Sequence, residues 1–265
     1  MKKRYLLVII FVFTVLGGGC ILVVLKTGFT MRTGAPVNFQ NADIPETTSD
    51  PQPIETAPSG QALPENSADK LIRYRVPFVV QAPTANWDDL VFQNACEEAS
   101  VIMAMGWVNG TESISSSDAQ KQISDIDDFE METFGYSYDT DVFDVKRIFE
   151  QYFKYNNVSI QENISIDDIK RELQAGNLVL VPAFGQALGN PNYTYPGPVV
   201  HMLVITGYDP AAREFITNDP GTRRGGGYRY DGNVLMDAVW QYPSGQDVPS
   251  VPLGSLKKAM IIVGK

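Results

Sequence analysis

Two residues in this chain could together carry out nucleophilic catalysis: a cysteine and a histidine. Cys96 opens an apolar segment, residues 95–107, with the composition of a buried helix, and His201 is the only histidine in the chain. A thiolate is the nucleophilic form of cysteine, and the free N–H groups at a helix N-terminus favour it. An imidazole can accept and return the thiol proton. The pair predicts catalysis with Cys96 as nucleophile and His201 as base.

The cysteine count supports a free thiol at this position. The chain has only two cysteines, and the other one, Cys20, lies in an apolar N-terminal run. A domain outside the cytoplasm normally pairs its thiols or lacks them, so an unpaired one is a candidate reactive group. Taken singly, Cys96 and His201 each fit a structural core residue as well. Their occurrence together, with a carboxylate within reach of the histidine, favours catalysis.

A hairpin supplies that carboxylate. The strand that contains His201 is followed by turn residues at Pro210 and then by a second strand. A hairpin centred on Pro210 places His201 opposite Asp219, and a slip of one residue places it opposite Asn218. Either side chain can hold one imidazole nitrogen and so direct the other toward the thiol.

The pattern of apolar residues predicts an α+β domain with a helical part first and an antiparallel sheet second. Helices are expected at 95–107, near 143–153 and at 165–176. Strands are expected at 73–80, 178–181, 199–206, 214–217, 227–230 and 260–263. This order is typical of α+β folds.

The N-terminal quarter of the chain predicts a membrane anchor and a spacer. Residues 1–26 combine a basic start with an apolar run, Tyr5 to Leu25, long enough for a transmembrane helix. The basic residues place the N-terminus in the cytoplasm and the domain outside it, as a single-pass protein of the cell membrane. A cleaved signal peptide and lipidation at Cys20 are alternatives. Residues 27–70 are a Pro/Ser/Thr-rich disordered stalk, and 71–265 are the folded domain.

Charge and motif order argue against several other functions. A formal net charge of −10 makes nucleic acid or anionic lipid an unfavourable partner. The aspartates in 125–128 and 139–144 lack the calcium-loop pattern, and the glycines in 220–227 lack the order of a phosphate-binding loop. We expect a monomer that needs no cofactor or metal and acts on a peptide or protein.

Four short motifs resemble a known family. They are Val76-Pro77-Phe78-Val79-Val80-Gln81, Cys96-Glu97-Glu98-Ala99-Ser100, His201 and Asn218-Asp219-Pro220-Gly221. The combination resembles the bacteriocin-processing-like cysteine peptidases, in the C-thirty-nine-like branch found in many bacterial surface proteins. The resemblance implies a papain-like fold and a triad of Cys96, His201 and Asp219. It also implies an oxyanion-stabilising role for Gln81, with Gln93 as the alternative.

One departure concerns the residue after the nucleophile, which is glycine in many relatives and Glu97 here. The leader peptides cut by transporter-linked members are not carried over, because this chain has no ATP-binding segment. The sequence thus predicts a membrane-anchored extracytoplasmic cysteine peptidase-like hydrolase that cleaves a peptide or amide bond. An inert binding module of the same fold and a thioester-based acyl transferase are the alternatives.

Overall fold

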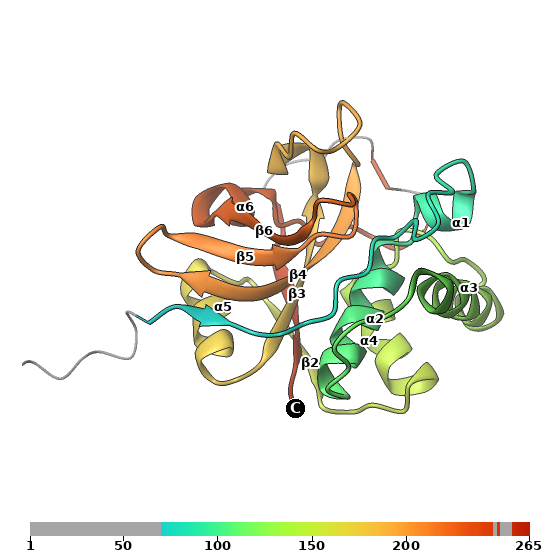
Figure 1. The fold of residues 1–265 in the computed structure, drawn as a ribbon, viewed down its shortest axis with the longest axis horizontal. Helices are drawn as coiled ribbons and strands as arrows, with labels where there is room; N and C mark the ends of the chain where they lie inside the picture. The colour runs from blue at the N-terminus through green and yellow to red at the C-terminus, as the bar shows by residue number, and fades with distance from the viewer. Residues whose placement is uncertain (1–69, 246–247, 250–255) are drawn as a thin grey trace, which may run out of the picture. The chain divides into compact units, whose positions relative to one another are not determined.

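A computed structural model describes residues 70–245, 248–249 and 256–265 (Figure 1). The predicted anchor and stalk, residues 1–26 and 27–70, lie outside these ranges apart from Lys70. Within the described ranges, no helix is both long and apolar enough to cross a bilayer.

The centre of the domain is one antiparallel sheet, as the alternating apolar segments predict. Its strands are β1 (Ile72–Arg73), β2 (Val158–Glu162), β3 (Leu178–Phe184), β4 (Val200–Asp209), β5 (Glu214–Asn218), β6 (Gly226–Asp231) and β7 (Ala259–Val263). They run in the order β2-β7-β3-β4-β5-β6, and β1 pairs with the far end of β4. Every strand pair in the sheet is antiparallel.

Helices cover both faces of this sheet (Figure 1). They are α1 (Leu90–Gln93), α2 (Cys96–Val108), α3 (Ser116–Thr133), α4 (Val142–Arg147), α5 (Ile166–Gln174) and α6 (Gly232–Ala238). A π-helical turn, η2 (Ile148–Tyr152), extends α4, and a 3-10 turn, η3 (Gly185–Leu188), follows β3. Helices α2, α3 and α4 pack on one face, and α5 and α6 on the other.

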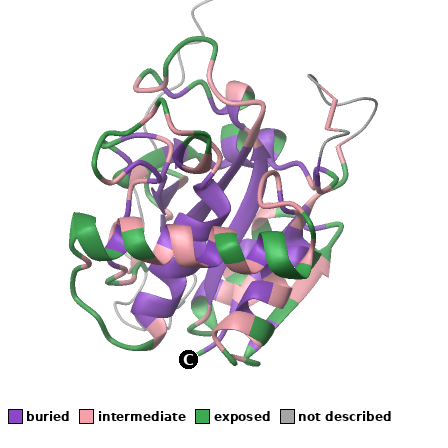
Figure 2. Ribbon diagram, turned by 90° about the vertical axis from the view of Figure 1, so that its right-hand side faces the viewer, coloured by how far each residue is buried: buried purple, intermediate pink, exposed green. Residues whose placement is uncertain are grey.

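The central strands are apolar on both sides because both faces are covered. In β3, Leu178 and Leu180 pack toward α2, whereas Val179 and Val181 pack toward α5 and α6. The side chains of successive strand residues point to opposite faces, so a strand buried on both faces reads as a continuous apolar run. Figure 2 shows the buried residues concentrated in the strands and on the inward sides of the helices.

The predicted α+β class and the order of most elements agree with the structure. The strand expected at 73–80 is wrong beyond Arg73, because only Ile72–Arg73 pair with β4. Pro77 has no N–H to donate to a ladder, which fits its position in extended, unpaired chain.

The longest helix of the described chain, α3, was not predicted from the sequence. Its buried residues are Ala119, Ile123, Ile126 and Glu130, which recur at helical spacing. The last of these is a carboxylate, and most of the remaining residues are polar or acidic. A charged residue in the core position interrupts the apolar pattern on which such predictions depend.

The predicted register of the β4–β5 hairpin is wrong by two residues. Val204 lies opposite Asn218. The next residue, Asp219, is therefore opposite Leu203 rather than His201. A bulge near Thr206 and a wider turn account for the shift. Because side chains alternate with a period of two, a shift of two residues keeps the same face. Asp219 therefore still reaches His201, as a diagonal neighbour.

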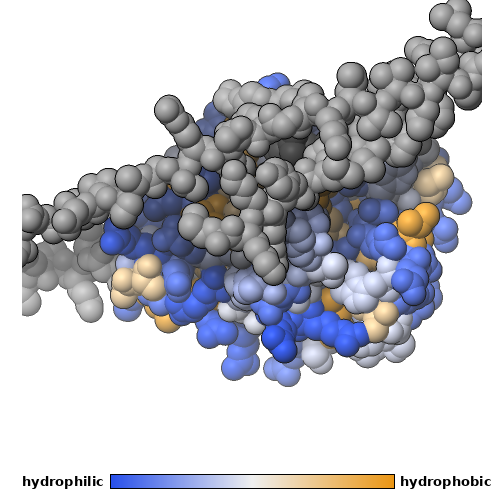
Figure 3. Space-filling view, turned by 90° about the horizontal axis from the view of Figure 1, so that it is seen from above, coloured by the Kyte–Doolittle hydropathy of each residue, from blue (hydrophilic) through white to orange (hydrophobic). Residues whose placement is uncertain are grey.

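Hydrophilic side chains predominate on the coloured part of the face in Figure 3. The large apolar residues that the described chain exposes are Leu71, Leu90, Met131, Phe143, Tyr195 and Val234. They come from different elements, and single exposed apolar residues are ordinary on the surface of a folded domain.

Gly207 permits the close approach of β1 to β4, which leads to our first prediction. A Cβ atom added at Gly207 would lie 2.1 Å from the carbonyl oxygen of Ile72. We expect Gly207→Ala to lower the free energy of unfolding by about 1–3 kcal/mol, because the strands must separate. Urea unfolding measures it, with Ser159→Ala on the exposed side of β2 as control. Equal stability of the two variants would contradict the prediction.

Candidate active site

The N-terminus of α2 holds Cys96 against the beginning of β4. The helix begins at Cys96 itself, as the composition of 95–107 predicts, and no side chain caps it. Four residues along α2, the Ser100 hydroxyl donates to the carbonyl oxygen of Met202 at 3.4 Å. The main chain of Met202 also lies close enough to Cys96 to act on its pKa. The thiol is therefore next to the residue that follows His201.

His201 and Asp219 form a buried pair. The Nε2 atom of His201 lies 2.9 Å from Oδ1 of Asp219, and both side chains are at most 1% exposed. Asn218, the alternative partner, donates instead to the carbonyl oxygens of Val76 and Pro77. Of the two candidates at the end of β5, Asp219 is the one that contacts the imidazole.

The second carboxylate oxygen of Asp219 is surrounded by donors. Its Oδ2 atom accepts from the hydroxyls of Tyr193 at 2.6 Å and Tyr230 at 2.5 Å, and from Nδ2 of Asn190 at 3.3 Å. Burial raises the pKa of Asp219, but the charge of His201 and the hydrogen bonds from His201, Tyr193 and Tyr230 lower it to about 2. The carboxylate is thus ionised at neutral pH although it is fully buried.

This contact also determines which imidazole nitrogen can act as a base. A carboxylate can only accept a hydrogen bond, so Nε2 of His201 carries the proton that Asp219 accepts. In a neutral imidazole the other nitrogen, Nδ1, then has a free lone pair. An ionised Asp219 stabilises the imidazolium that forms when Nδ1 takes up a proton.

Gln81 lies in the same region, but its amide group is already in use. Its Nε2 atom donates to the main-chain carbonyls of Phe92 at 3.2 Å and Gln93 at 2.7 Å. An amide nitrogen has two N–H groups, so both are directed to the end of α1 in this state. The first-turn N–H groups of α2 are the other donors near the thiol, because the first N–H groups of a helix have no partner within it.

A cavity of about 410 Å³ brings the predicted site residues together. It is lined by Gln81, Gln93, Asn94, Cys96, Asp139, Pro198, Val199, Val200, His201 and Val248. Asp219 lies behind His201, fully buried. The candidate nucleophile, the candidate base and both oxyanion candidates thus border one space that a substrate carbonyl could enter.

The acidic side chains near Cys96 act against a thiolate. The thiol donates to Oε2 of Glu97 at 2.9 Å, and the Tyr242 hydroxyl donates to the other oxygen of that carboxyl. Burial, the charge of Glu97, its hydrogen bond and the charge of Glu98 raise the pKa of Cys96, and only the Met202 main chain opposes them. The expected lowering of the thiol pKa at the helix N-terminus is therefore wrong for this state.

The pKa of Glu97 itself is raised to near neutral pH. Burial raises its pKa, the hydrogen bonds from Cys96 and Tyr242 lower it, and the charge of Asp139 raises it, giving about 7. The carboxyl of Glu97 can thus gain or lose a proton near neutral pH while in contact with the thiol.

Two buried glutamates, one on α2 and one on α3, form an acidic pair. Glu98 and Glu130 are 2% and 0% exposed, and Glu98 Oε2 and both carboxyl oxygens of Glu130 have no hydrogen-bond partner among the described residues. Burial and mutual repulsion raise the pKa of Glu98, and burial raises that of Glu130 to about 8. At neutral pH the folded state therefore keeps protons that the unfolded chain releases.

Other acidic residues have structural explanations. Asp125 pairs with Lys121 on α3, and Asp141 caps α4 through the N–H groups of Phe143 and Asp144. No group of His, Cys, Asp and Glu in the described part of the chain has the arrangement of a metal site.

Sequence reasoning did not identify the residues that surround the triad candidates. Asn190, Tyr193 and Tyr230 hold Asp219, whereas Tyr242 holds Glu97. They come from separate loops and a strand, and no spacing in the sequence links them to Cys96 or His201. Only Glu97 left a signal, as a departure from the glycine of many relatives.

Comparison with known proteins identifies the family of the chain. The model of the Peptidase_C39 like family matches residues 74–248, which is more than half of the chain. The chain belongs to the C39-like peptidase family. It is a cysteine peptidase-like enzyme with a papain-like α+β fold, as its sequence motifs predict.

Solved structures and curated proteins contribute less to the family assignment. A structure from Bacillus anthracis that is named as a C39-like peptidase aligns with a TM-score of 0.47 and 16% identity, over 74% of this chain and 99% of that one. No curated protein matches the chain. The family match therefore carries the assignment of this C39-like chain.

The contact between Glu97 and the thiol leads to a second prediction. We expect Glu97→Gln to increase the rate at which iodoacetamide labels Cys96 at pH 8, by about tenfold for each unit by which the thiol pKa falls. The reason is that the substitution removes the nearest negative charge. Glu112→Gln, at an exposed position, is the control for general charge effects. A rate equal to that of the wild type or lower would contradict the prediction.

The Glu98–Glu130 pair leads to a third prediction, on stability. Because the folded state binds protons that the unfolded chain loses above its ordinary pKa of 4.5, the free energy of unfolding should fall as pH rises from about 4.5 to about 8. Glu130→Gln should reduce this loss, since a neutral amide has no proton to release. Thermal unfolding at pH 5 and pH 8 measures the difference.

The matched control for this experiment is Glu132→Gln, an exposed position on the same helix. It should keep the full pH dependence of the wild type. An unchanged pH dependence in Glu130→Gln would show that the buried pair does not titrate in this range.

Proposed function

We propose that this C39-like chain hydrolyses a peptide or amide bond, with Cys96 as nucleophile, His201 as base and Asp219 as the residue that orients the base. The observation that supports it best is the buried hydrogen bond between His201 Nε2 and Asp219 Oδ1, at the edge of a cavity that Cys96 also lines. A histidine held in this way has its second nitrogen available for a thiol.

In the proposed reaction, Nδ1 of His201 takes the proton of the Cys96 thiol as the sulfur attacks the substrate carbonyl. The C–S bond forms, and the carbonyl oxygen becomes an oxyanion that the first-turn N–H groups of α2 can stabilise. The imidazolium then gives its proton to the leaving amine as the C–N bond breaks. Water hydrolyses the resulting thioester and releases the acid and the free thiol.

The contacts of Cys96 and Gln81 require two changes before this reaction. The thiol proton must leave the Glu97 carboxylate for His201, and one N–H of Gln81 must leave the carbonyl of Phe92 or Gln93 if Gln81 is to bind the oxyanion. Each change replaces one hydrogen bond by another. We propose that substrate entry into the cavity drives both.

A second candidate, an inert binding module of the same fold, is favoured by one observation. Cys96 donates to a carboxylate, and burial raises its pKa, which is the opposite of an activated thiol. Acyl transfer is the third possibility, because an amine in place of water would capture the same thioester. Product analysis with and without an added amine separates hydrolysis from transfer.

We also propose that residues 5–25 anchor the chain in the cell membrane as a single span, with the catalytic domain outside the cytoplasm. The basic start and the length of the apolar run support this location. Extraction of cell membranes with carbonate, followed by protease treatment of intact cells, tests the anchor and its orientation.

The proposed triad leads to a fourth prediction. Cys96→Ala and His201→Ala should each abolish cleavage of a random-sequence decapeptide library followed by mass spectrometry. Asp219→Ala should lower the rate by roughly 10²- to 10⁴-fold, because the tautomer and the imidazolium lose their support. Ser117→Ala, at an exposed position of α3, is the control and should retain full activity.

Two further readings make the experiment decisive. Circular dichroism of each variant shows whether the fold is kept, and labelling with an iodoacetamide probe across pH reports thiol activation separately from substrate choice. Cleavage by Cys96→Ala would contradict the mechanism. Slow labelling that does not depend on His201, together with no cleavage, would favour the binding module.

A further inference from the structure

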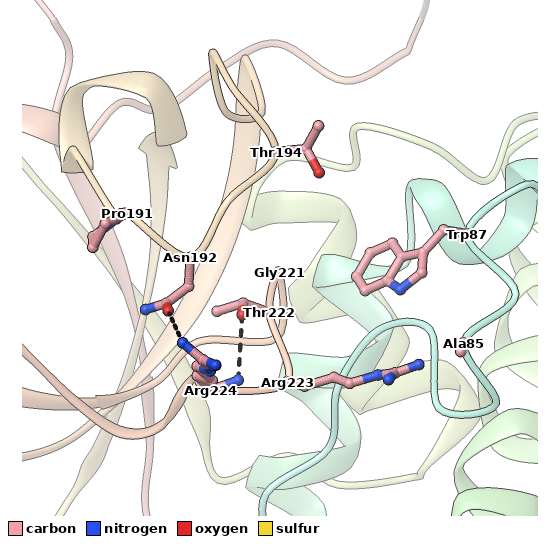
Figure 4. Close-up of a pocket in the computed structure, with 9 residues that line it drawn as sticks. All are labelled: Ala85, Trp87, Pro191, Asn192, Thr194, Gly221, Thr222, Arg223 and Arg224. Carbon is pink, nitrogen blue, oxygen red and sulfur yellow. Dashed lines mark hydrogen bonds between the residues drawn. The ribbon is translucent and has the colours of Figure 1, made fainter.

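A second and larger cavity lies beside the candidate active site. Its volume is about 650 Å³, and it is lined by Ala85, Trp87, Pro191, Asn192, Thr194, Gly221, Thr222, Arg223 and Arg224. In Figure 4, Trp87 and Arg223 lie on one side, Asn192 and Arg224 on the other, and Gly221 and Thr222 between them. This volume is within the range of ordinary ligand sites.

Gly221 joins this cavity to the candidate catalytic residues. Its N–H donates to Oδ1 of Asp219 at 3.0 Å. A Cβ atom added at Gly221 would lie 2.9 Å from Cε1 of His201 and 3.1 Å from Cε1 of Tyr193. Gly221 therefore packs directly against the edge of the imidazole, which places this cavity next to His201 although His201 does not line it. A peptide bound at Cys96 would reach it within a few residues, at about 3.3 Å per residue.

The charge of the cavity is positive, in contrast to the rest of the chain. Two arginines line it, and none of its lining residues is acidic. Arg147, Arg171 and Arg229 form ion pairs with carboxylates, whereas neither Arg223 nor Arg224 does so with any residue in the described ranges. The net charge of −10 repels an acidic ligand at a distance, but salt screens this effect beyond about 8 Å. At contact distance the two guanidinium groups dominate.

The surroundings of the two arginines suit a carboxylate. The N–H of Arg224 donates to Thr222 Oγ1 at 3.2 Å, which fixes the main chain, and its Nη1 donates to Asn192 Oδ1 at 3.4 Å. One of the five N–H groups of Arg224 is used in this way, and the others remain for a ligand. A guanidinium binds a carboxylate through two parallel hydrogen bonds, and the Trp87 ring offers apolar surface for the carbon atoms that bear it.

We propose that this cavity is a substrate subsite that binds a carboxylate group of the peptide, supplied by an acidic side chain or by the C-terminus. The proposal rests on the proposed hydrolase function of the same site, and it names the substrate class as acidic peptides. It also gives Arg223 and Arg224 a role that the solvated turn between β5 and β6 does not require.

Peptide binding tests the subsite without catalysis. The full-length chain with Cys96→Ala is titrated into fluorescent, Ala-based octapeptides in which one Glu, or one Gln as its neutral match, is moved through the sequence. Binding is followed by fluorescence anisotropy. A second pair of peptides, with a free and an amidated C-terminus, separates the two sources of the carboxylate. Circular dichroism shows whether each variant is folded.

We expect the Glu peptide to bind about tenfold more tightly than its Gln match at one position or two neighbouring ones, or the free C-terminus to do so against the amide. Adding Arg223→Gln or Arg224→Gln should remove most of this preference. Arg213→Gln, which removes the same charge in the turn at the opposite end of β5, should leave it unchanged.

Three outcomes overturn the proposal. They are equal binding of all matched peptides, including no detectable binding, a preference that survives both arginine substitutions, and a preference that Arg213→Gln reduces equally. Cleavage of the same peptides by the wild-type chain is scored separately. Cleavage without a carboxylate preference rejects the subsite and keeps the hydrolase, whereas a preference in binding without cleavage keeps the subsite and rejects the hydrolase.

Discussion

The candidate active site depends on one buried charge, the carboxylate of Asp219. A carboxylate without solvent is costly unless hydrogen bonds and an opposite charge compensate for it. Here His201 contacts one oxygen, and Tyr193, Tyr230 and Asn190 donate to the other. These donors come from the loop after η3, from β4 and from β6. The need to satisfy one carboxylate therefore brings these segments together and fixes the position of the imidazole.

Two opposing influences meet at Cys96. The main chain of Met202 favours a thiolate, whereas burial, the hydrogen bond to Glu97 and the charges of Glu97 and Glu98 favour the thiol. In this structure the second group prevails, so the pKa of Cys96 is raised. Because the pKa of Glu97 is about 7, its carboxyl is about half ionised at neutral pH. A thiol that stays protonated until a substrate alters its surroundings would be protected from oxidation.

His201 lines one of the two cavities and packs against Gly221, a residue that lines the other. His201 is the second residue of β4, and its side chain is buried where the strand begins. Gly221 contacts the imidazole and lines the arginine-lined cavity, while Cys96, Gln81 and His201 line the other one. A peptide that lies across the end of the strand would contact both cavities. The chemistry and the recognition of charge would then depend on the same loop, residues 219–225.

The sequence by itself determined the residue types, the α+β class, the start of the Cys96 helix and the family, because these depend on local composition and short motifs. It also narrowed the partner of His201 to Asp219 or Asn218, of which the structure selects Asp219. The predicted register was wrong by two residues, since alternation fixes the face of a strand more firmly than its alignment. Only the tertiary structure decided which groups surround the candidates. The hydrogen bond from Tyr242 to Glu97, the tyrosines around Asp219 and the pairing of Glu98 with Glu130 join segments far apart in the chain. Burial, which reverses the expected pKa of Cys96, exists only after the chain has folded.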